Sequence, residues 1–189
     1  MGQNIYGVDI GTSNFKMCCK DKDKIINEKN IIAIANKKDI LAFGDEAYEM
    51  YEKAPEHIEV SFPVKFGVIA DIENMQTLLL RFFNKMNDDK KFTGNTDFYI
   101  AVPTDVTEVE KRAFYELVAD SKVKAKNIYI VDKPVADAIG AGLDVTKSKG
   151  IMIVNIGAET TEISVLSLGG IVISKSVKIG GNKLDDSII

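Results

Sequence analysis

The sequence predicts an α/β protein built on a mixed β-sheet with flanking helices. Three observations carry this prediction: apolar runs of strand length at both ends, alternating strand and helix patterns in the middle, and 46% hydrophobic with 28% charged residues. That composition is ordinary for a globular chain, and 189 residues suit one well-buried domain or two small ones. The net charge of −4 gives no general attraction to nucleic acid, so no nucleic-acid partner is expected.

The start of the chain reads as three strands joined by tight turns, at residues 5–10, 14–20 and 24–34. Cys18 and Cys19 are adjacent on the second of these strands, so they are expected on opposite faces as reduced thiols. A short strand, Gly44 and a helix ended by Pro55 are expected next.

The middle of the chain alternates helix and strand. Residues 71–88 carry apolar side chains at three- and four-residue spacing, which predicts an amphipathic helix with Asp71 as its N-cap. After a polar loop and a buried strand at 97–103, Thr107 and Glu110 form a capping-box pattern that opens a helix over 108–121. A buried strand at 127–132 and a helix over 134–144 follow, which favours a mixed sheet covered by helices.

The end of the chain repeats the pattern of its beginning. Strands are predicted at 150–156, 159–168 and 170–179, and "VNIG" at 154–157 matches "VDIG" at 8–11 at an offset of 146 residues. At the same offset the isoleucines at 25, 26 and 31 meet apolar residues, so the repeat is expected to keep its register over all three strands. The last ten residues read as a loop entering a helix that has barely begun, so the second copy is expected to be cut short.

Each copy follows its first strand with a short turn, "DIGTSN" or "NIGAET", that suits an anion. Backbone N–H groups in such turns bind phosphate without basic side chains, and Gly11 and Gly157 permit close approach. Thr12 can donate its hydroxyl, and Lys16 adds a point charge for phosphate. Asp9, at the strand end, suits contact with a hydrated Mg²⁺ through water. An ordinary hairpin turn is the alternative for each copy.

Five segments together carry a family resemblance: "VDIGTSNFK", "GVIAD", "VPTDVTEVEKRA", "KPVADAIGAGL" and "NIGAETTEISVLSLGGIVISKSVKIGG". They resemble the MreB family of bacterial rod-shape actin homologues, almost from end to end. The resemblance implies an actin/Hsp70-like ATPase fold, in which RNase H-like domains hold ATP and Mg²⁺ between them. Residues 1–148 would form the first domain, with a small insertion at about 33–70, and 149–189 the truncated start of a second RNase H-like domain.

The resemblance also implies which residues hold the nucleotide. The first phosphate loop would comprise Asp9, Gly11, Thr12, Ser13 and Asn14, with Lys16, and the second Asn155, Gly157, Ala158, Glu159 and Thr160. Several positions depart from the family pattern, among them Ala158 and Glu159, which stand where the family has two glycines. Asn155 stands where the family has an aspartate that helps to hold the metal, and Lys133 stands where it has the glutamate that orients the attacking water. Lys133 could reach a γ-phosphate, or it could pair with Asp137 one helical turn further on; hydrolysis is therefore left open.

The function implied is a cytoskeletal filament subunit that binds ATP and organises cell shape and the cell wall. A nucleotide-degenerate partner or cap of an intact MreB filament is the alternative, and a sugar kinase or Hsp70-type chaperone is less favoured by the long C-terminal match. Partners would be the chain itself, as a filament or a strand-swapped dimer, or an intact homologue. Because the apolar pattern starts at Ile5, no cleavable signal is expected before it, and the expected compartment is the cytoplasm. Phe92, beside two lysines, could contact the inner membrane, or it could lie at a solvated loop tip.

Overall fold

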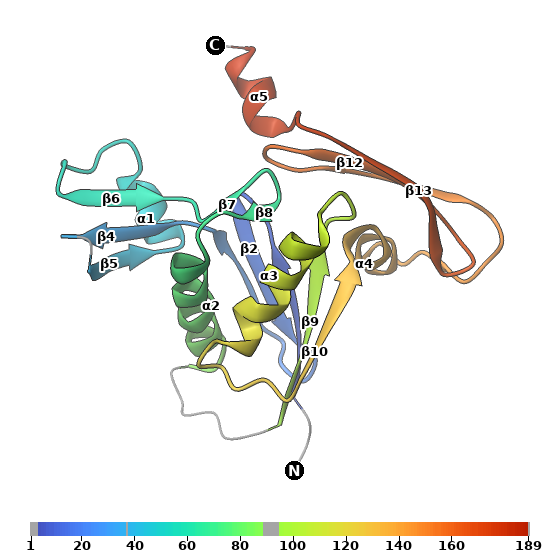
Figure 1. Cartoon of the computed structure of the whole chain (residues 1–189), viewed down its shortest axis with the longest axis horizontal. Coiled ribbons are helices and arrows are strands. Elements are labelled where there is room, and N and C mark those ends of the chain that lie inside the picture. Colours follow the sequence, from blue (N-terminus) through green and yellow to red (C-terminus); the bar gives the residue numbers. More distant parts are fainter. Residues whose placement is uncertain (1–3, 37, 89–94, 189) are drawn as a thin grey trace.

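A five-stranded mixed sheet forms the centre of the computed structural model, which describes residues 4–36, 38–88 and 95–188 (Figure 1). The strand order is β10-β9-β1-β2-β3. The strands are β1 (Asn4–Ile10), β2 (Asn14–Cys19), β3 (Ile25–Lys29), β9 (Thr96–Val102) and β10 (Asn127–Asp132). β1, β2 and β3 pair antiparallel, whereas β9 is parallel to both β1 and β10. The predicted mixed sheet is confirmed.

Two helices, α2 (Ile72–Met86) and α3 (Glu108–Ala119), pack on one face of this sheet and enclose the core. Both start at the predicted caps. The Asp71 side chain accepts the Asn74 N–H at 3.0 Å, and Thr107 and Glu110 form both hydrogen bonds of the capping box. The apolar face of α2 is buried except for Ile72, which lies at its first turn. The local sequence signals therefore predicted these two helices well.

The opposite face of the sheet carries the short helix α4 (Lys133–Gly140), which starts one residue before the predicted range. Cys18 lies on this side and is exposed, while Cys19 is buried on the other, as alternation along a strand requires. Tyr99 and Tyr129 stack here with ring centroids 4.7 Å apart and stay partly exposed.

The third predicted strand is wrong as a single element, because the chain leaves the central sheet at Asn30. Residues after it form β4 (Ile32–Ala35) in a separate sheet of order β5-β4-β6, with β5 (Asp39–Phe43) and β6 (Ile58–Ser61). Asn30 is buried, and its backbone and side-chain N–H groups donate to carbonyl oxygens of Ser13 and Gly11 at 2.8 Å. This pair of bonds turns the chain away from the sheet.

The helix expected to reach Pro55 also ends early. α1 (Asp45–Met50) stops because Tyr51 is extended and Glu52 has a φ of 61°, which no helix continues. The small hairpin of β7 (Val64–Lys65) and β8 (Val68–Ile69) follows β6. Among the described residues, none of the helices is both long and apolar enough to cross a membrane.

The last part of the chain forms β11 (Ile151–Ile156), β12 (Thr161–Ser167) and β13 (Gly170–Val177) as an antiparallel sheet, then α5 (Gly181–Asp186). The repeat holds in the first two strands, since Asp9 pairs with Lys16 and Asn155 pairs with Glu162. It fails in the third: Cys18 pairs with Ile25, but Ile171 pairs with Leu166 instead of Ser164. The second hairpin closes in a tight turn at Leu168 and Gly169, both with positive φ, which displaces β13.

Candidate functional site

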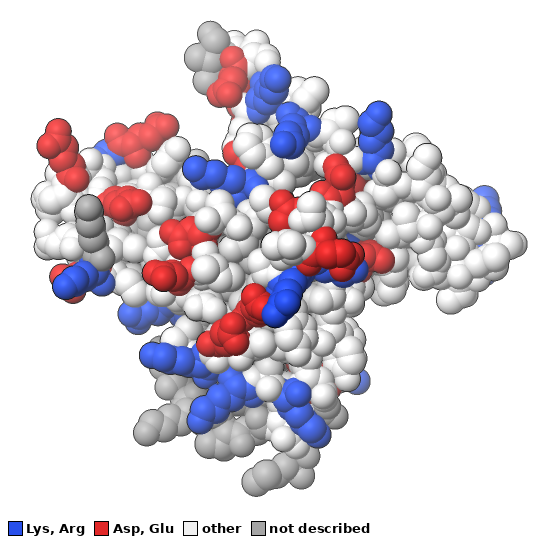
Figure 2. All heavy atoms as spheres, viewed as in Figure 1, with Lys and Arg blue, Asp and Glu red and all other residues white. Residues whose placement is uncertain are grey.

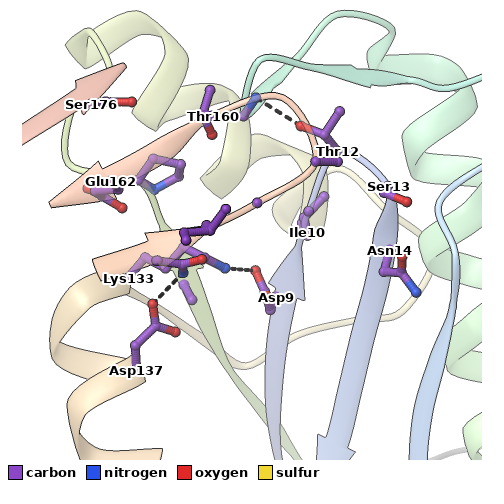
Figure 3. A pocket seen from close by; sticks show the side chains of 18 of the residues that line it. Asp9, Ile10, Thr12, Ser13, Asn14, Lys133, Asp137, Thr160, Glu162 and Ser176 are labelled. Carbon is purple, nitrogen blue, oxygen red and sulfur yellow. Dashed lines mark hydrogen bonds and ion pairs between the residues drawn. The ribbon is translucent and has the colours of Figure 1, made fainter. Parts of the chain in front are cut away.

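The turns after β1 and β11 face each other across a cleft of about 740 Å³ (Figure 3). This volume lies within the roughly 300–1,000 Å³ typical of small-molecule sites. Every predicted site residue except Glu159 lines the cleft: Asp9, Gly11, Thr12, Ser13, Asn14, Lys16, Lys133, Asn155, Gly157, Ala158 and Thr160. Figure 2 shows acidic and basic side chains interspersed over the face drawn, without one sign covering it.

The two turns share one backbone construction. The Gly11 N–H donates to the Asn14 carbonyl at 3.0 Å, and the Gly157 N–H donates to the Thr160 carbonyl at 2.8 Å. A Cβ atom on Gly11 would lie 2.7 Å from the Asn14 oxygen, and one on Gly157 would lie 3.1 Å from the Thr160 oxygen. A side chain at Gly11 would therefore clash with the carbonyl that closes its own turn, and one at Gly157 would be in tight contact with it.

Asp9 is the charged centre of the cleft. Its Oδ1 accepts from the Lys133 ammonium (Figure 3), and its Oδ2 accepts from Lys16 Nζ at 2.9 Å. The Asp9 and Lys133 side chains are 23% and 17% exposed, against 52% for Lys16. Burial by itself raises the pKa of Asp9, but the charges and hydrogen bonds of Lys133 and Lys16 outweigh it and hold this pKa below its usual range.

Of the two alternatives left open for Lys133, the pairing with Asp137 does not form. Lys133 instead extends to Asp9 on β1, and Asp137 Oδ2 accepts from Asn155 Nδ2 at 2.5 Å. A helix favours the order in which the acid precedes the base by four residues, and here the order is reversed. Asn155 thus holds the carboxylate that would have competed for Lys133.

Glu159 is the one predicted site residue that does not line the cleft. Its Oε2 accepts the Phe66 N–H at 2.6 Å, in the turn between β7 and β8. The next residue, Gly67, donates its N–H to Thr12 Oγ1 at 3.1 Å. This turn therefore ties the two loops together, and the Glu159 carboxylate is held by the turn instead of facing a ligand.

Three further features of the site were not anticipated. Glu162, 7% exposed, accepts at Oε1 from the N–H (2.9 Å) and the hydroxyl of Thr104, which fastens β12 to the segment after β9. Gly181 and Asn182 donate their N–H groups to carbonyls of the second loop at 2.9 Å. Ser176 also lines the cleft. The offset of 146 matches Glu162 to Lys16, so the sequence carried a signal that Glu162 lies near the cleft but none for its bond to Thr104.

The cleft fits an anion better than a divalent metal. Within the described ranges, no three His, Cys, Asp or Glu side chains are grouped to hold a metal ion. Both oxygens of Asp9, the residue predicted to contact Mg²⁺ through water, are engaged by ammonium groups. Lysine side chains such as Lys16 and Lys133, by contrast, suit phosphate as point charges.

Comparison with known proteins gives one consistent result. The family model described as "MreB/Mbl protein" matches residues 3–189. The cell shape-determining protein Mbl of Bacillus subtilis is 39% identical over 184 residues, which cover 97% of this chain and 54% of that protein. The cell shape-determining protein MreB of Escherichia coli is 34% identical over 194 residues, covering 100% and 55%. The chain spans about half the length of these relatives.

Solved structures agree. MreB 5 of Spiroplasma citri bound to AMPPNP superposes with a TM-score of 0.89 at 32% identity, covering 100% of this chain and 56% of that one. The MamK double helical filament superposes with a TM-score of 0.77 at 22% identity, covering 98% and 57%, and this likeness concerns the fold alone.

Proposed function

Since the chain belongs to the MreB/Mbl family, we propose that it is a nucleotide-binding subunit of an actin-like filament that organises cell shape and the cell wall. The observation that carries the proposal is the cleft between two turns of matching construction, with Lys16 and Lys133 among the residues that line it. ATP is the nucleotide proposed, because a relative of similar fold was solved with AMPPNP. The proposed compartment is the cytoplasm.

We propose the domain division that the resemblance implied, with residues 1–148 in the first domain, an insertion at about 33–70, and 149–189 in the second. The division is supported by three separate sheets: the central one, the β5-β4-β6 sheet and the β11-β12-β13 sheet. The cleft then lies between the two domains, since its lining comes from both. Membrane contact through Phe92 concerns a residue outside the described part of the chain.

The nucleotide would be held with little turnover. Lys133 lies at the family's water-orienting position, and its ammonium is engaged with Asp9. A protonated lysine cannot take a proton from water, so it is no general base while charged. We therefore propose that hydrolysis is weak or lost and that nucleotide occupancy governs assembly.

Self-association is the proposed partner interaction. β11 and β13 are the outer strands of their sheet, and Met152, Val172 and Ile173 on them are largely exposed. In Figure 2 the corresponding region at the right shows few charged side chains. Apolar patches and unpaired strand edges favour pairing with another chain. Light scattering of the concentrated chain should show a dimer or larger species; a clean monomer would contradict this part of the proposal.

The alternative is a structural partner or cap of an intact homologue, and the occupied Asp9 carboxylate is the observation that favours it. Sedimentation of the purified protein with and without ATP and Mg²⁺ separates the two. A filament subunit should pellet in a nucleotide-dependent way, and Asp9→Ala should change that dependence while Asp21→Ala, on an exposed turn, should not. Polymer indifferent to nucleotide and to Asp9→Ala, or no polymer, would refute the nucleotide-binding filament and leave the cap.

A further inference from the structure

We propose that the cleft binds nucleotide phosphates without a divalent metal, because the Lys133 ammonium is built in as the cation of the site. The inference rests on the proposed nucleotide-binding function and departs from the metal-dependent pattern that the family resemblance implied. It concerns side chains of this chain alone: Asp9, Lys16 and Lys133.

The position of Lys133 is defined by its surroundings. It is the first residue of α4, and Pro134 follows it, so its backbone is held in the opening turn of a helix. Its side chain is only 17% exposed and reaches Asp9 across 124 positions of sequence. Asn155 binds Asp137, which leaves Asp9 as the carboxylate that Lys133 pairs with. The fold thus places the Lys133 ammonium in the lining of the cleft, beside Asp9.

Each of the less exposed carboxylates that line the cleft already forms a hydrogen bond or a salt bridge within the protein. Asp9 has both oxygens on lysines, Asp137 binds Asn155, and Glu162 binds Thr104. Asp105 is the fourth acid that lines the cleft, and it is exposed at the rim. Magnesium usually takes one or two carboxylates together with substrate phosphates and keeps several waters. Here both oxygens of Asp9 are engaged by ammonium groups, and Asp137 and Glu162 each have one oxygen engaged in hydrogen bonds.

The net charge of the site explains how an ammonium group can take the place of a divalent cation. One carboxylate with two ammonium groups carries the same net charge as one carboxylate with a divalent cation, a single positive charge. The ammonium of Lys133 has three N–H donors; Asp9 takes one, and the others can meet phosphate oxygens. A divalent ion brought to Asp9 would be repelled at close range by Lys16 and Lys133 in a partly desolvated space.

The test is AMPPNP binding measured by calorimetry in excess EDTA and in excess Mg²⁺. The two affinities of the unmodified protein should differ by less than about tenfold. Lys133→Gln removes the charge and frees one oxygen of Asp9, so its affinity in EDTA should fall by more than about tenfold, and Mg²⁺ should restore part of it. Lys133→Arg keeps the cation and should keep metal-free binding. Lys122→Gln, an exposed lysine outside the cleft, is the matched control and should behave like the unmodified protein.

The outcomes separate the inference from the function beneath it. Binding that needs Mg²⁺ in the unmodified protein overturns the inference and leaves nucleotide binding in place. Binding in neither buffer overturns both. If Lys133→Gln binds in EDTA as well as the unmodified protein, Lys133 is not the cation, and the inference fails. Circular dichroism of each variant excludes misfolding as the cause of a loss.

Discussion

Replacing Asp9 by Asn should destabilise the chain, because it leaves the Lys133 ammonium without its counter-charge in an enclosed place. The Lys133 side chain is 17% exposed, and Asp9 supplies the salt bridge that balances it. Asn keeps the shape and one hydrogen-bond acceptor of Asp, so the change tests charge more than packing. The second partner, Lys16, is 52% exposed and can turn to water.

The burial of each pair sets the magnitude expected. Exposed ion pairs contribute roughly 0.2–1 kcal/mol, whereas removing one partner of a fully buried pair costs about 3–5 kcal/mol. The Asp9–Lys133 pair lies between these limits, so Asp9→Asn should lower the free energy of unfolding by about 1–3 kcal/mol. The Asp9–Lys16 pair belongs to the exposed class and should contribute less than about 1 kcal/mol.

Urea denaturation followed by circular dichroism measures both values through two double-mutant cycles. Combining Asp9→Asn with Lys133→Gln should give a coupling energy of about 1–3 kcal/mol, because the second change removes the stranded charge. Combining Asp9→Asn with Lys16→Gln should give less than about 1 kcal/mol. A coupling to Lys16 as large as that to Lys133, or no coupling to either, would refute the view that Lys133 is the fixed cation of the site.

Three other substitutions test the packing of the fold. Phe82→Ala should cost about 3–5 kcal/mol in urea denaturation, because its buried ring stacks on Phe15 with centroids 4.5 Å apart; a loss under about 1 kcal/mol would contradict this packing. Burial raises the pKa of Tyr6 from 10.0 to about 12, so its contribution to stability is full below pH 10.0 and is lost as the pH rises towards about 12. Tyr6→Phe should remove that alkaline loss, and parallel pH profiles of urea midpoints would be evidence against it. Gly180→Ala should destabilise by about 1–3 kcal/mol in thermal unfolding, because its Cβ would lie 2.6 Å from the backbone of the second loop. Gly140→Ala, with nothing within 4 Å of its Cβ, is the control, and equal effects would contradict the clash.

Much of the fold could be predicted where neighbours in sequence decide the outcome. The N-cap Asp71 and the capping box of Thr107 and Glu110 are contacts across three residues, and both form as expected. The repeat between the first and last strands also held for β1 with β2 and β11 with β12, because each pair is joined by a turn closed by one glycine N–H.

The candidate site was predicted less completely. The other residues of both turns line one cleft, but the Glu159 carboxylate binds the Phe66 N–H instead. Glu162 lines the cleft although it was not among the predicted site residues. Each difference involves a partner distant in the chain: Phe66 lies 93 positions from Glu159, and Thr104 lies 58 from Glu162. Residue types and spacing carry no information about such distances.

The sequence by itself determined the family, the strand and helix types, the caps and the residues of the two turns, since these depend on local conformation and side-chain chemistry. Tertiary structure alone decided that the chain leaves the sheet at Asn30, that β13 is displaced in register, and that Lys133 pairs with Asp9 while Asp137 pairs with Asn155. The physical reason is competition. A side chain with several chemically suitable partners takes the one that packing brings within hydrogen-bond distance, and packing is settled by the whole fold.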